Sequence, residues 1–356
     1  MIDCSKEISK FHGGNVRLTE DQRQQMRDHR NANQKRLRKG LEDSKKPLPD
    51  RNIKQGSYAM HTMVQHPDND YDIDDGAVFT RDDLKGQRDG DMSPREARDM
   101  VRDALDDGSF STPPETKKNC VRVQYQAGYH VDVPVYREYE NDSGKTVLEL
   151  ASSEWRESDP QQLTNWFNNA VSNKSPDENN GQQLRRIVCL LKQFARSRKS
   201  WKLPSGLILS VLADEKYWSC DGRDDLALYQ TMQAMRDRLN VTISVYNPVD
   251  SSEELSKGSD DPKVQELKDR LDWAIDRLQD VFNDTCSKNE ALKRWNDISH
   301  SVRLCAVAVG FFSNPVVLAV GFELASFPYF KFFRVQIDDV SPRAVAAVSE
   351  APVKSR

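Results

Sequence analysis

Two aspartates separated by a single isoleucine, Asp72-Ile73-Asp74, constrain the fold of this chain more than any other feature. They lie in the segment Tyr71–Phe79, whose Val, Ile and aromatic content is typical of a β-strand. Side chains alternate along a strand with a period of two, so Asp72 and Asp74 share one face and Ile73 anchors the other in the core. Two neighbouring carboxylates repel each other unless a cation lies between them. The pattern therefore predicts ligands for a Mg²⁺ pair.

A third aspartate, Asp132, lies among β-branched and aromatic residues in the predicted strand Tyr129–Tyr136. A carboxylate in so apolar a strand is costly unless it is paired or bound to a metal ion. Beside Asp72 and Asp74, it would complete the metal site and could accept the proton of an attacking ribose hydroxyl.

Both assignments have an alternative. Asp72 and Asp74 could belong to a solvated acidic turn, since Asp, Asn and Asp occupy positions 68–70 and Asp75 follows. Asp132 could face water from an edge strand, with Pro134 marking the edge.

The pair Gly56-Ser57 ends another predicted strand, Ile53–Ser57. A glycine lets the backbone approach a ligand closely, while the serine hydroxyl and the amides that follow can bind phosphate oxygens. Alone, such a pair is typical of an ordinary tight turn. With the aspartates downstream, it predicts the phosphate end of a nucleotide site.

A strongly basic stretch lies between residues 180 and 213, which contain no Asp or Glu. Its seven cations are Arg185, Arg186, Lys192, Arg196, Arg198, Lys199 and Lys202. A helix whose charged residues are all positive favours binding of a polyanion such as a triphosphate. A solvated basic face is the alternative. Lys192 lies among Leu190, Leu191 and Phe194, which predicts that it reaches inward.

The order of the predicted elements indicates an α+β lobe followed by a helical lobe. A polar helix, Leu18–Leu41 with Thr19 as its cap, precedes the strands, and a helix capped by Ser93 lies between them. The remaining strand is predicted at Cys120–Tyr125. After Leu150, apolar residues recur at helical spacing in Pro160–Val171, Gln182–Arg198, Ser205–Glu215, Asp225–Leu239 and Val264–Phe282.

Composition excludes little but points to a cytoplasmic protein. With 356 residues the chain can build two lobes with a cleft, and its near-balanced net charge of −4 does not suggest wholesale nucleic-acid binding. Its six cysteines are scattered, without zinc-ligand spacing, as expected of reduced thiols. Residues Leu304–Phe322 carry no charge, but a Ser-Asn-Pro break favours a buried strand or helix pair over a membrane span.

The order Gly-Ser, Asp-Ile-Asp and a single strand aspartate resembles the polymerase β-like nucleotidyltransferase superfamily. More narrowly, the chain resembles the bacterial cGAS/DncV-like nucleotidyltransferases, or CD-NTases. The passages that support the narrower match are Asp72-Ile73-Asp74-Asp75-Gly76, Leu184–Lys192 followed by Leu203-Pro204-Ser205-Gly206, and Val245–Asp250. The resemblance covers about residues 15–300.

The resemblance implies a nucleotidyltransferase lobe with a mixed sheet and flanking helices, a helical lobe, and an active site in the cleft between them. The corresponding domains are residues 1–150 with the long N-terminal helix, 151–300 for the helical lobe, an apolar segment of unknown role at 301–340, and a flexible tail at 341–356. Asp72, Asp74 and Asp132 would be catalytic residues and ligands of two Mg²⁺ ions, with Mn²⁺ as an alternative metal. The nucleotide-binding residues would be Gly56, Ser57, Lys192 and Ser205.

The function implied is condensation of nucleoside triphosphates, with release of pyrophosphate, into a cyclic di- or trinucleotide that acts as an antiphage signal through an effector protein. ATP is the expected substrate, with GTP or UTP as further ones. An enzyme that transfers one nucleotide to tRNA, protein or a small molecule is an alternative. A nucleotide-binding protein without catalysis is a second alternative, which the three aspartates argue against.

The sequence departs from the family pattern in two places, and the resemblance bears on two further partners, duplex DNA and a conjugation system. The gap between Ser57 and Asp72 is longer than usual, with residues 66–69 as the insertion, and the apolar region after Arg303 has no family counterpart. Activation by duplex DNA is not expected, because no Cys/His cluster corresponds to the zinc ribbon of the animal relative. The tail permits, without specific support, joining of the C-terminus to cellular targets by a conjugation system.

Overall fold

The structure is a computed structural model, and it describes residues 1–66, 71–86, 90–126, 128–283 and 285–299. All of these belong to one compact unit, Met1–Val309. The predicted insertion at 66–69 is largely outside the described residues, and so are the predicted segments 301–340 and 341–356. Within the described part, no helix is long and apolar enough to cross a membrane.

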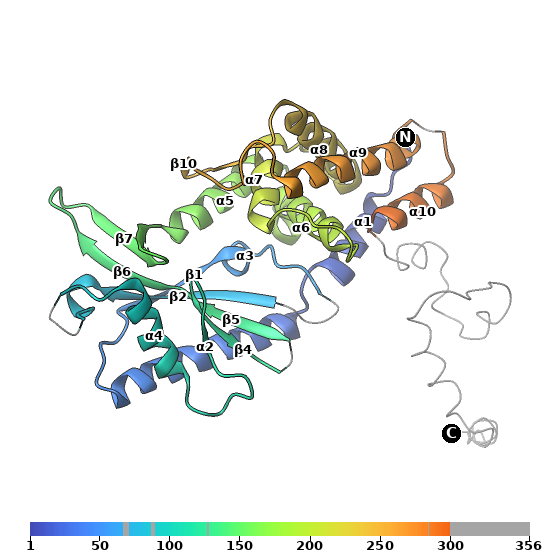
Figure 1. The fold of residues 1–356 in the computed structure, drawn as a ribbon. Helices are drawn as coiled ribbons and strands as arrows, with labels where there is room; N and C mark the ends of the chain where they lie inside the picture. The colour runs from blue at the N-terminus through green and yellow to red at the C-terminus, as the bar shows by residue number, and fades with distance from the viewer. Residues whose placement is uncertain (67–70, 87–89, 127, 284, 300–356) are drawn as a thin grey trace, which may run out of the picture. The chain divides into compact units, whose positions relative to one another are not determined.

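A mixed sheet of eight strands forms the first lobe (Figure 1). The strands are β1 (Arg51–Gln55), β2 (Tyr71–Thr80), β3 (Glu115–Thr116), β4 (Val121–Gln124), β5 (Tyr129–Val133), β6 (Val135–Glu140), β7 (Thr146–Ala151) and β8 (Trp155–Glu157). Their order is β3-β4-β5-β2-β6-β7-β8, with β1 paired to β2. Strand β2 runs parallel to both β5 and β6 and antiparallel to β1, so it lies inside the sheet.

Pro134 divides the predicted strand Tyr129–Tyr136 into β5 and β6 without placing it at an edge. Strand β5 pairs with β2 on one side and with β4 on the other, and β6 pairs with β2 and β7. The two strands keep one register along β2, and the Pro134 carbonyl accepts a hydrogen bond from Ala77. The edge-strand alternative for Asp132 is therefore wrong.

Two helices cover one face of this sheet, as Figure 1 shows. They are α2 (Glu20–Asp43) and α4 (Pro94–Leu105). Each begins with the predicted cap: Thr19 and Ser93 both form capping boxes. Ile73 is fully buried in the core that these helices share with the sheet, as predicted. Asp72 and Asp74 thus lie on the opposite face. The short elements of this lobe are helix α3 (Gly56–Ala59) and the 3₁₀ turn η2 (Arg81–Asp83).

The second lobe is helical. Its helices are α5 (Pro160–Lys174), α6 (Gln183–Arg196), α7 (Gly206–Lys216), α8 (Asp224–Val241), α9 (Pro262–Phe282) and α10 (Lys288–Ser299), with a 3₁₀ turn η3 (Asn179–Gly181) and a hairpin of β9 (Tyr246–Asn247) and β10 (Asp250–Glu254). The five predicted helices are present with ends shifted by a few residues, and α10 was not predicted. The chain start also differs from prediction: helix α1 (Ser5–Phe11) and the π-helix η1 (His12–Val16) pack in the helical core, not in the first lobe.

Candidate active site

The three aspartates converge on adjacent parallel strands. Asp74 on β2 lies directly opposite Asp132 on β5, and Asp72 lies opposite His130. Asp132 is buried, Asp74 is half-buried and Asp72 is exposed. The strand geometry excludes the alternative of a solvated acidic turn at Asp72 and Asp74. It also creates a gradient from a buried carboxylate to one that faces the cleft.

Asp74 combines burial with neighbouring negative charge. Burial, followed by the charges of Asp132 and Asp72, raises the pKa of Asp74 to about 7 from its ordinary value of 3.8. Gly56 is the immediate neighbour of this carboxylate: a Cβ built on Gly56 would lie 2.2 Å from Asp74 Oδ2, and the glycine has a φ of +64°. Glycine therefore allows the turn to touch the carboxylate in a conformation that other residues rarely adopt.

A cavity of about 700 Å³ joins these residues to the helical lobe. The sheet side contributes Gly56, Ser57, Asp72 and Asp74, and the helical side contributes Lys192 and Ser205. The further cations that line it are Arg196, Arg198, Lys199, Lys202 and Lys263. Six of the seven residues predicted from the sequence thus line one cavity, and Asp132 stands behind Asp74 on the next strand. One wall is acidic and the other basic, an arrangement that suits a triphosphate with bound cations.

Lys192 reaches inward, as predicted. Its side chain is 8% exposed, and its Nζ donates to Thr62 Oγ1 at 2.6 Å. Burial, together with the nearby charge of Arg196, lowers the pKa of Lys192 to about 8. The side chain passes over Gly206, where a Cβ would lie 2.9 Å from Lys192 Cε. Ser205 caps α7, and its Oγ accepts from the Ile208 amide at 3.4 Å. Lys192 and the start of α7 therefore form one positively polarised patch.

The third aspartate already has a cationic partner. Arg122 on β4 donates from Nε to Asp132 Oδ1 at 2.8 Å and from Nη2 to Asp132 Oδ2 at 2.7 Å. Among the described residues, no group of three or more His, Cys, Asp and Glu side chains is arranged to hold a metal ion. The donor chemistry nevertheless fits a hard divalent cation, because Asp74 lies opposite Asp132 and shares its strand face with Asp72. A metal ion at Asp72, Asp74 and Asp132 would have to share Asp132 with Arg122 or displace it.

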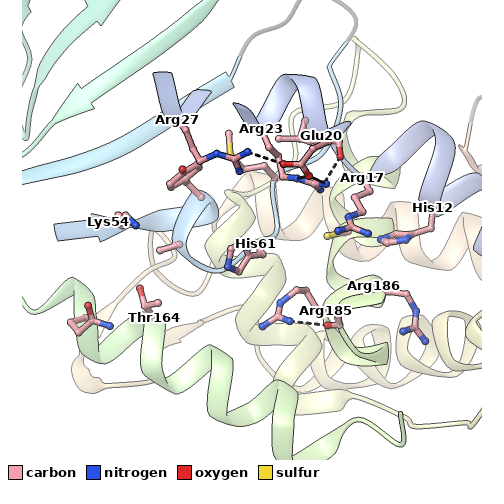
Figure 2. Close-up of a pocket in the computed structure, with 17 residues that line it drawn as sticks. His12, Arg17, Glu20, Arg23, Arg27, Lys54, His61, Thr164, Arg185 and Arg186 are labelled. Carbon is pink, nitrogen blue, oxygen red and sulfur yellow. Dashed lines mark hydrogen bonds and ion pairs between the residues drawn. The ribbon is translucent and has the colours of Figure 1, made fainter. Parts of the chain in front are cut away.

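A second cavity of about 700 Å³, shown in Figure 2, is lined by Tyr58 and Ala59 of α3 and by residues of both lobes. It contains none of the predicted site residues. Its basic lining consists of Arg17, Arg23, Arg27, Lys54, Arg185 and Arg186, with His12 and His61, against the single carboxylate Glu20. Arg186 is already neutralised by Asp177 and Asp224, whereas Glu20 is shared by Arg23 and Arg27. The cavity therefore keeps an excess of positive charge.

Sequence reasoning missed Arg122, Thr62 and this second cavity. One signal was present: Arg23 and Arg27 are four residues apart on the predicted polar helix and so share a face. Arg122 gave no signal, because an arginine in a short strand is ordinary.

Comparison with known proteins agrees with this fold. The family described as "Cyclic GMP-AMP synthase DncV-like, nucleotidyltransferase domain" matches residues 50–136. A cyclic GMP-AMP synthase of Escherichia albertii is 27% identical over 258 residues, which cover 67% of this chain and 52% of that protein. The chain thus spans about half the length of this curated relative.

Solved structures of DncV enzymes share the fold at low sequence identity. Vibrio cholerae DncV cyclic AMP-GMP synthase, in complex with the linear intermediate 5′ pppA(3′,5′)pG, is 18% identical, with a TM-score of 0.68 over 85% of this chain and 98% of that one. Escherichia coli DncV in its 3′-deoxy GTP bound form is 18% identical, with a TM-score of 0.63 over 82% of this chain and 93% of that one.

The mixed sheet and the helical lobe define a polymerase β-like nucleotidyltransferase fold. Within that class, residues 50–136 match the DncV-like nucleotidyltransferase domain, and the chain is similar to the cyclic GMP-AMP synthase of E. albertii.

Proposed function

We propose that this chain condenses nucleoside triphosphates, with release of pyrophosphate, into a cyclic di- or trinucleotide second messenger. The observation that carries this proposal is the cavity whose acidic wall holds Asp72 and Asp74 and whose basic wall holds Lys192. The named relatives are synthases of cyclic GMP-AMP, which supports a cyclic product.

Asp72, Asp74 and Asp132 would hold two Mg²⁺ ions, or Mn²⁺ in their place. When bound, such ions polarise the α-phosphate and neutralise charge on the leaving pyrophosphate. The carboxylates supply hard oxygen ligands, and the half-buried position of Asp74 keeps bulk water from competing fully. Asp132, freed from its arginine, would also accept the proton of the attacking ribose hydroxyl.

The triphosphate would lie between the Gly56-Ser57 turn and the basic wall. Ser57 and the backbone of α3 offer hydrogen-bond donors, while Lys192 exchanges its neutral partner Thr62 for phosphate oxygens. Ser205 adds a hydroxyl at the positively polarised start of α7. Catalysis of this kind depends on positioning and charge stabilisation more than on covalent chemistry by the protein.

The test uses the full chain with labelled ATP, GTP and UTP, Mg²⁺ and then phosphatase. A phosphatase-resistant product that disappears in Asp72→Ala plus Asp74→Ala supports cyclisation. Label transferred only to an added tRNA, protein or small molecule would identify the single-transfer alternative, and nucleotide binding without product would identify the non-catalytic one. The expected setting is antiphage signalling in the cytoplasm through an effector that binds the product. Conjugation of the C-terminus rests on the family resemblance alone.

We further propose that the basic cavity of Figure 2 binds a second anion. Arg23 and Arg27 approach it from α2, and Arg185 approaches from α6, with His61 between them. V. cholerae DncV has been solved with GTP together with a further ligand, 5MTHFGLU2, which supports a second site in this fold. Calorimetry with tripolyphosphate should detect two binding events, of which Arg23→Gln plus Arg27→Gln removes one and Lys192→Gln the other. Two events in the arginine variant would contradict the proposal.

A further inference from the structure

Arg122 lies between two of the carboxylates proposed to bind metal. It faces Asp132 across the β4–β5 pair, and its guanidinium engages both oxygens of that carboxylate. Its Nη2 is also 3.5 Å from Asp72 Oδ1. The Arg122 guanidinium therefore contacts both Asp132 and Asp72. A metal ion bound by these two aspartates would need lone pairs of the same carboxylates.

The pair is strong and partly removed from water. The Asp132 side chain is 10% exposed and that of Arg122 is 32% exposed. Two parallel charge-assisted hydrogen bonds hold the carboxylate more firmly than a single contact would. The hydrogen bond to Asp132 raises the pKa of Arg122 further above its ordinary value, so the guanidinium stays charged. Each oxygen of Asp132 therefore accepts one hydrogen bond from Arg122, so a metal ion would have to share these oxygens with the guanidinium or displace it.

We propose that Arg122 is a built-in counter-cation that competes with a divalent ion for Asp132 and Asp72, so that the chain binds metal tightly only together with a nucleoside triphosphate. The proposal rests on the proposed function, because it assumes that these aspartates are the metal site. A free ion would weaken or displace the contacts of the guanidinium with Asp132 without offering it another partner. A triphosphate supplies additional ligands for the metal and phosphate oxygens that suit a guanidinium. Metal and nucleotide consequently bind with positive coupling.

The alternative is that Arg122 merely joins two strands. Elsewhere in this sheet Arg51 on β1 donates to both oxygens of Glu138 on β6. That pair is more exposed than Arg122 and Asp132, at 46% and 28%, and includes none of the proposed metal ligands. Arg51→Gln is therefore a matched control for the loss of a cross-strand arginine–carboxylate pair.

The experiment measures Mn²⁺ affinity of the full-length chain without nucleotide, by electron paramagnetic resonance, for the parent, Arg122→Gln and Arg51→Gln. Arg122→Gln should bind Mn²⁺ about tenfold more tightly or better, within the range of coupling between linked sites, and Arg51→Gln should match the parent. With a nonhydrolysable GTP analogue present, the Mn²⁺ affinities of the parent and Arg122→Gln should differ by about threefold or less. The reason is that bound nucleotide draws Arg122 away from Asp132 in the parent, as the substitution does in the variant.

Arg122→Lys distinguishes the effect of the two parallel hydrogen bonds from the effect of the positive charge. A lysine keeps the positive charge but cannot engage both oxygens in the same way, so Mn²⁺ affinity should lie between those of the parent and Arg122→Gln. Equal affinity in Arg122→Lys and the parent would point to a general field effect and overturn the proposal, as would unchanged or weaker binding in a folded Arg122→Gln. If Arg122→Gln fails to melt cooperatively, the lysine variant alone decides. Product formation by the parent tests the proposed function separately, because the metal titration needs no turnover.

Discussion

Lys192 Nζ lies 2.6 Å from Thr62 Oγ1 and 3.3 Å from the Thr62 carbonyl oxygen, so a buried ammonium on α6 is held by neutral groups just after α3. From the same helix, Arg185 Nε donates to the Met60 carbonyl at 3.1 Å. Two turns of α6 thus hold the segment that follows the Gly56-Ser57 turn. Between these two contacts His61 has a φ of +54°, which is uncommon for a residue other than glycine.

Lys192→Met should weaken nucleotide binding much more than it affects folding. A hydrogen bond to a charged group contributes about 1.5–3 kcal/mol, which corresponds to roughly 10- to 150-fold in the dissociation constant. The measurement is binding of a nonhydrolysable ATP analogue by calorimetry. Lys174→Met is the control, since Lys174 pairs with Asp214 and does not line the cavity. Equal affinities of Lys192→Met and the parent would contradict the role of Lys192.

Nucleotide binding should also weaken as the pH rises above about 8. Burial lowers the pKa of Lys192 to about 8, so the free protein loses this positive charge at higher pH. A bound triphosphate favours the charged form and raises the pKa of Lys192 again, so the loss of affinity begins at the pKa of the free protein. This component should be absent from the pH profile of Lys192→Met.

Asp74→Asn should stabilise the metal-free protein in a pH-dependent way. Asp74 has a pKa of about 7 in the folded chain and an ordinary value of 3.8, so between about pH 4 and pH 7 its carboxylate takes up a proton on folding. Its contribution to the free energy of unfolding therefore falls as the pH rises from about 4 to about 7. At pH 8 the variant should have a higher melting temperature than the parent, and its free energy of unfolding should be larger by a few kcal/mol at most, on the order of the pKa difference. The difference should shrink toward pH 4 in thermal melts with EDTA. A pH-independent difference would contradict the electrostatic cause.

Gly56→Ala should disrupt the site through its contact with Asp74. A left-handed backbone costs a residue with a Cβ about 1–2 kcal/mol, and here the Cβ would also lie 2.2 Å from Asp74 Oδ2. Gly108→Ala is a matched control, because Gly108 has a φ of +74° and nothing within 4 Å of a built Cβ. Both variants should lose stability in chemical denaturation, and only Gly56→Ala should lose product formation. Equal activities would show that the close approach is not required.

Ser205 offers a way to separate capping from nucleotide binding. Ser205→Ala removes the cap of α7 and should cost about 1 kcal/mol of stability. Ser205→Asp retains a capping oxygen but places a negative charge in the cavity, so it should fold well and bind nucleotide more weakly than Ser205→Ala does. Thermal melts and analogue binding, measured on both variants, give the two readouts. Weaker binding in the alanine variant than in the aspartate variant would be inconsistent with a triphosphate at this helix start.

Local patterns predicted much of the fold. The caps at Thr19 and Ser93, the helices of the second lobe and the strand that carries Asp72 and Asp74 follow from short-range rules of hydrogen bonding and periodicity. The start of the chain was assigned to the wrong lobe, because Ile8 and Phe11 join a core most of whose members lie more than 150 residues away, from Phe167 onward. An amphipathic segment specifies that it needs a partner surface without specifying which one.

The sequence by itself determined the composition of the candidate site: three aspartates, a Gly-Ser turn and an inward lysine, each recognisable from its neighbours along the chain. The tertiary structure decided how they meet. Parallel pairing of β2 with β5 placed Asp74 beside Asp132, and the antiparallel β4–β5 pair brought Arg122 onto the same carboxylate. The physical reason is that strand register and lobe packing depend on burial summed over distant segments, whereas a motif depends on adjacent residues. The guanidinium that competes for the proposed metal ligands therefore could not be predicted from the motif that contains them.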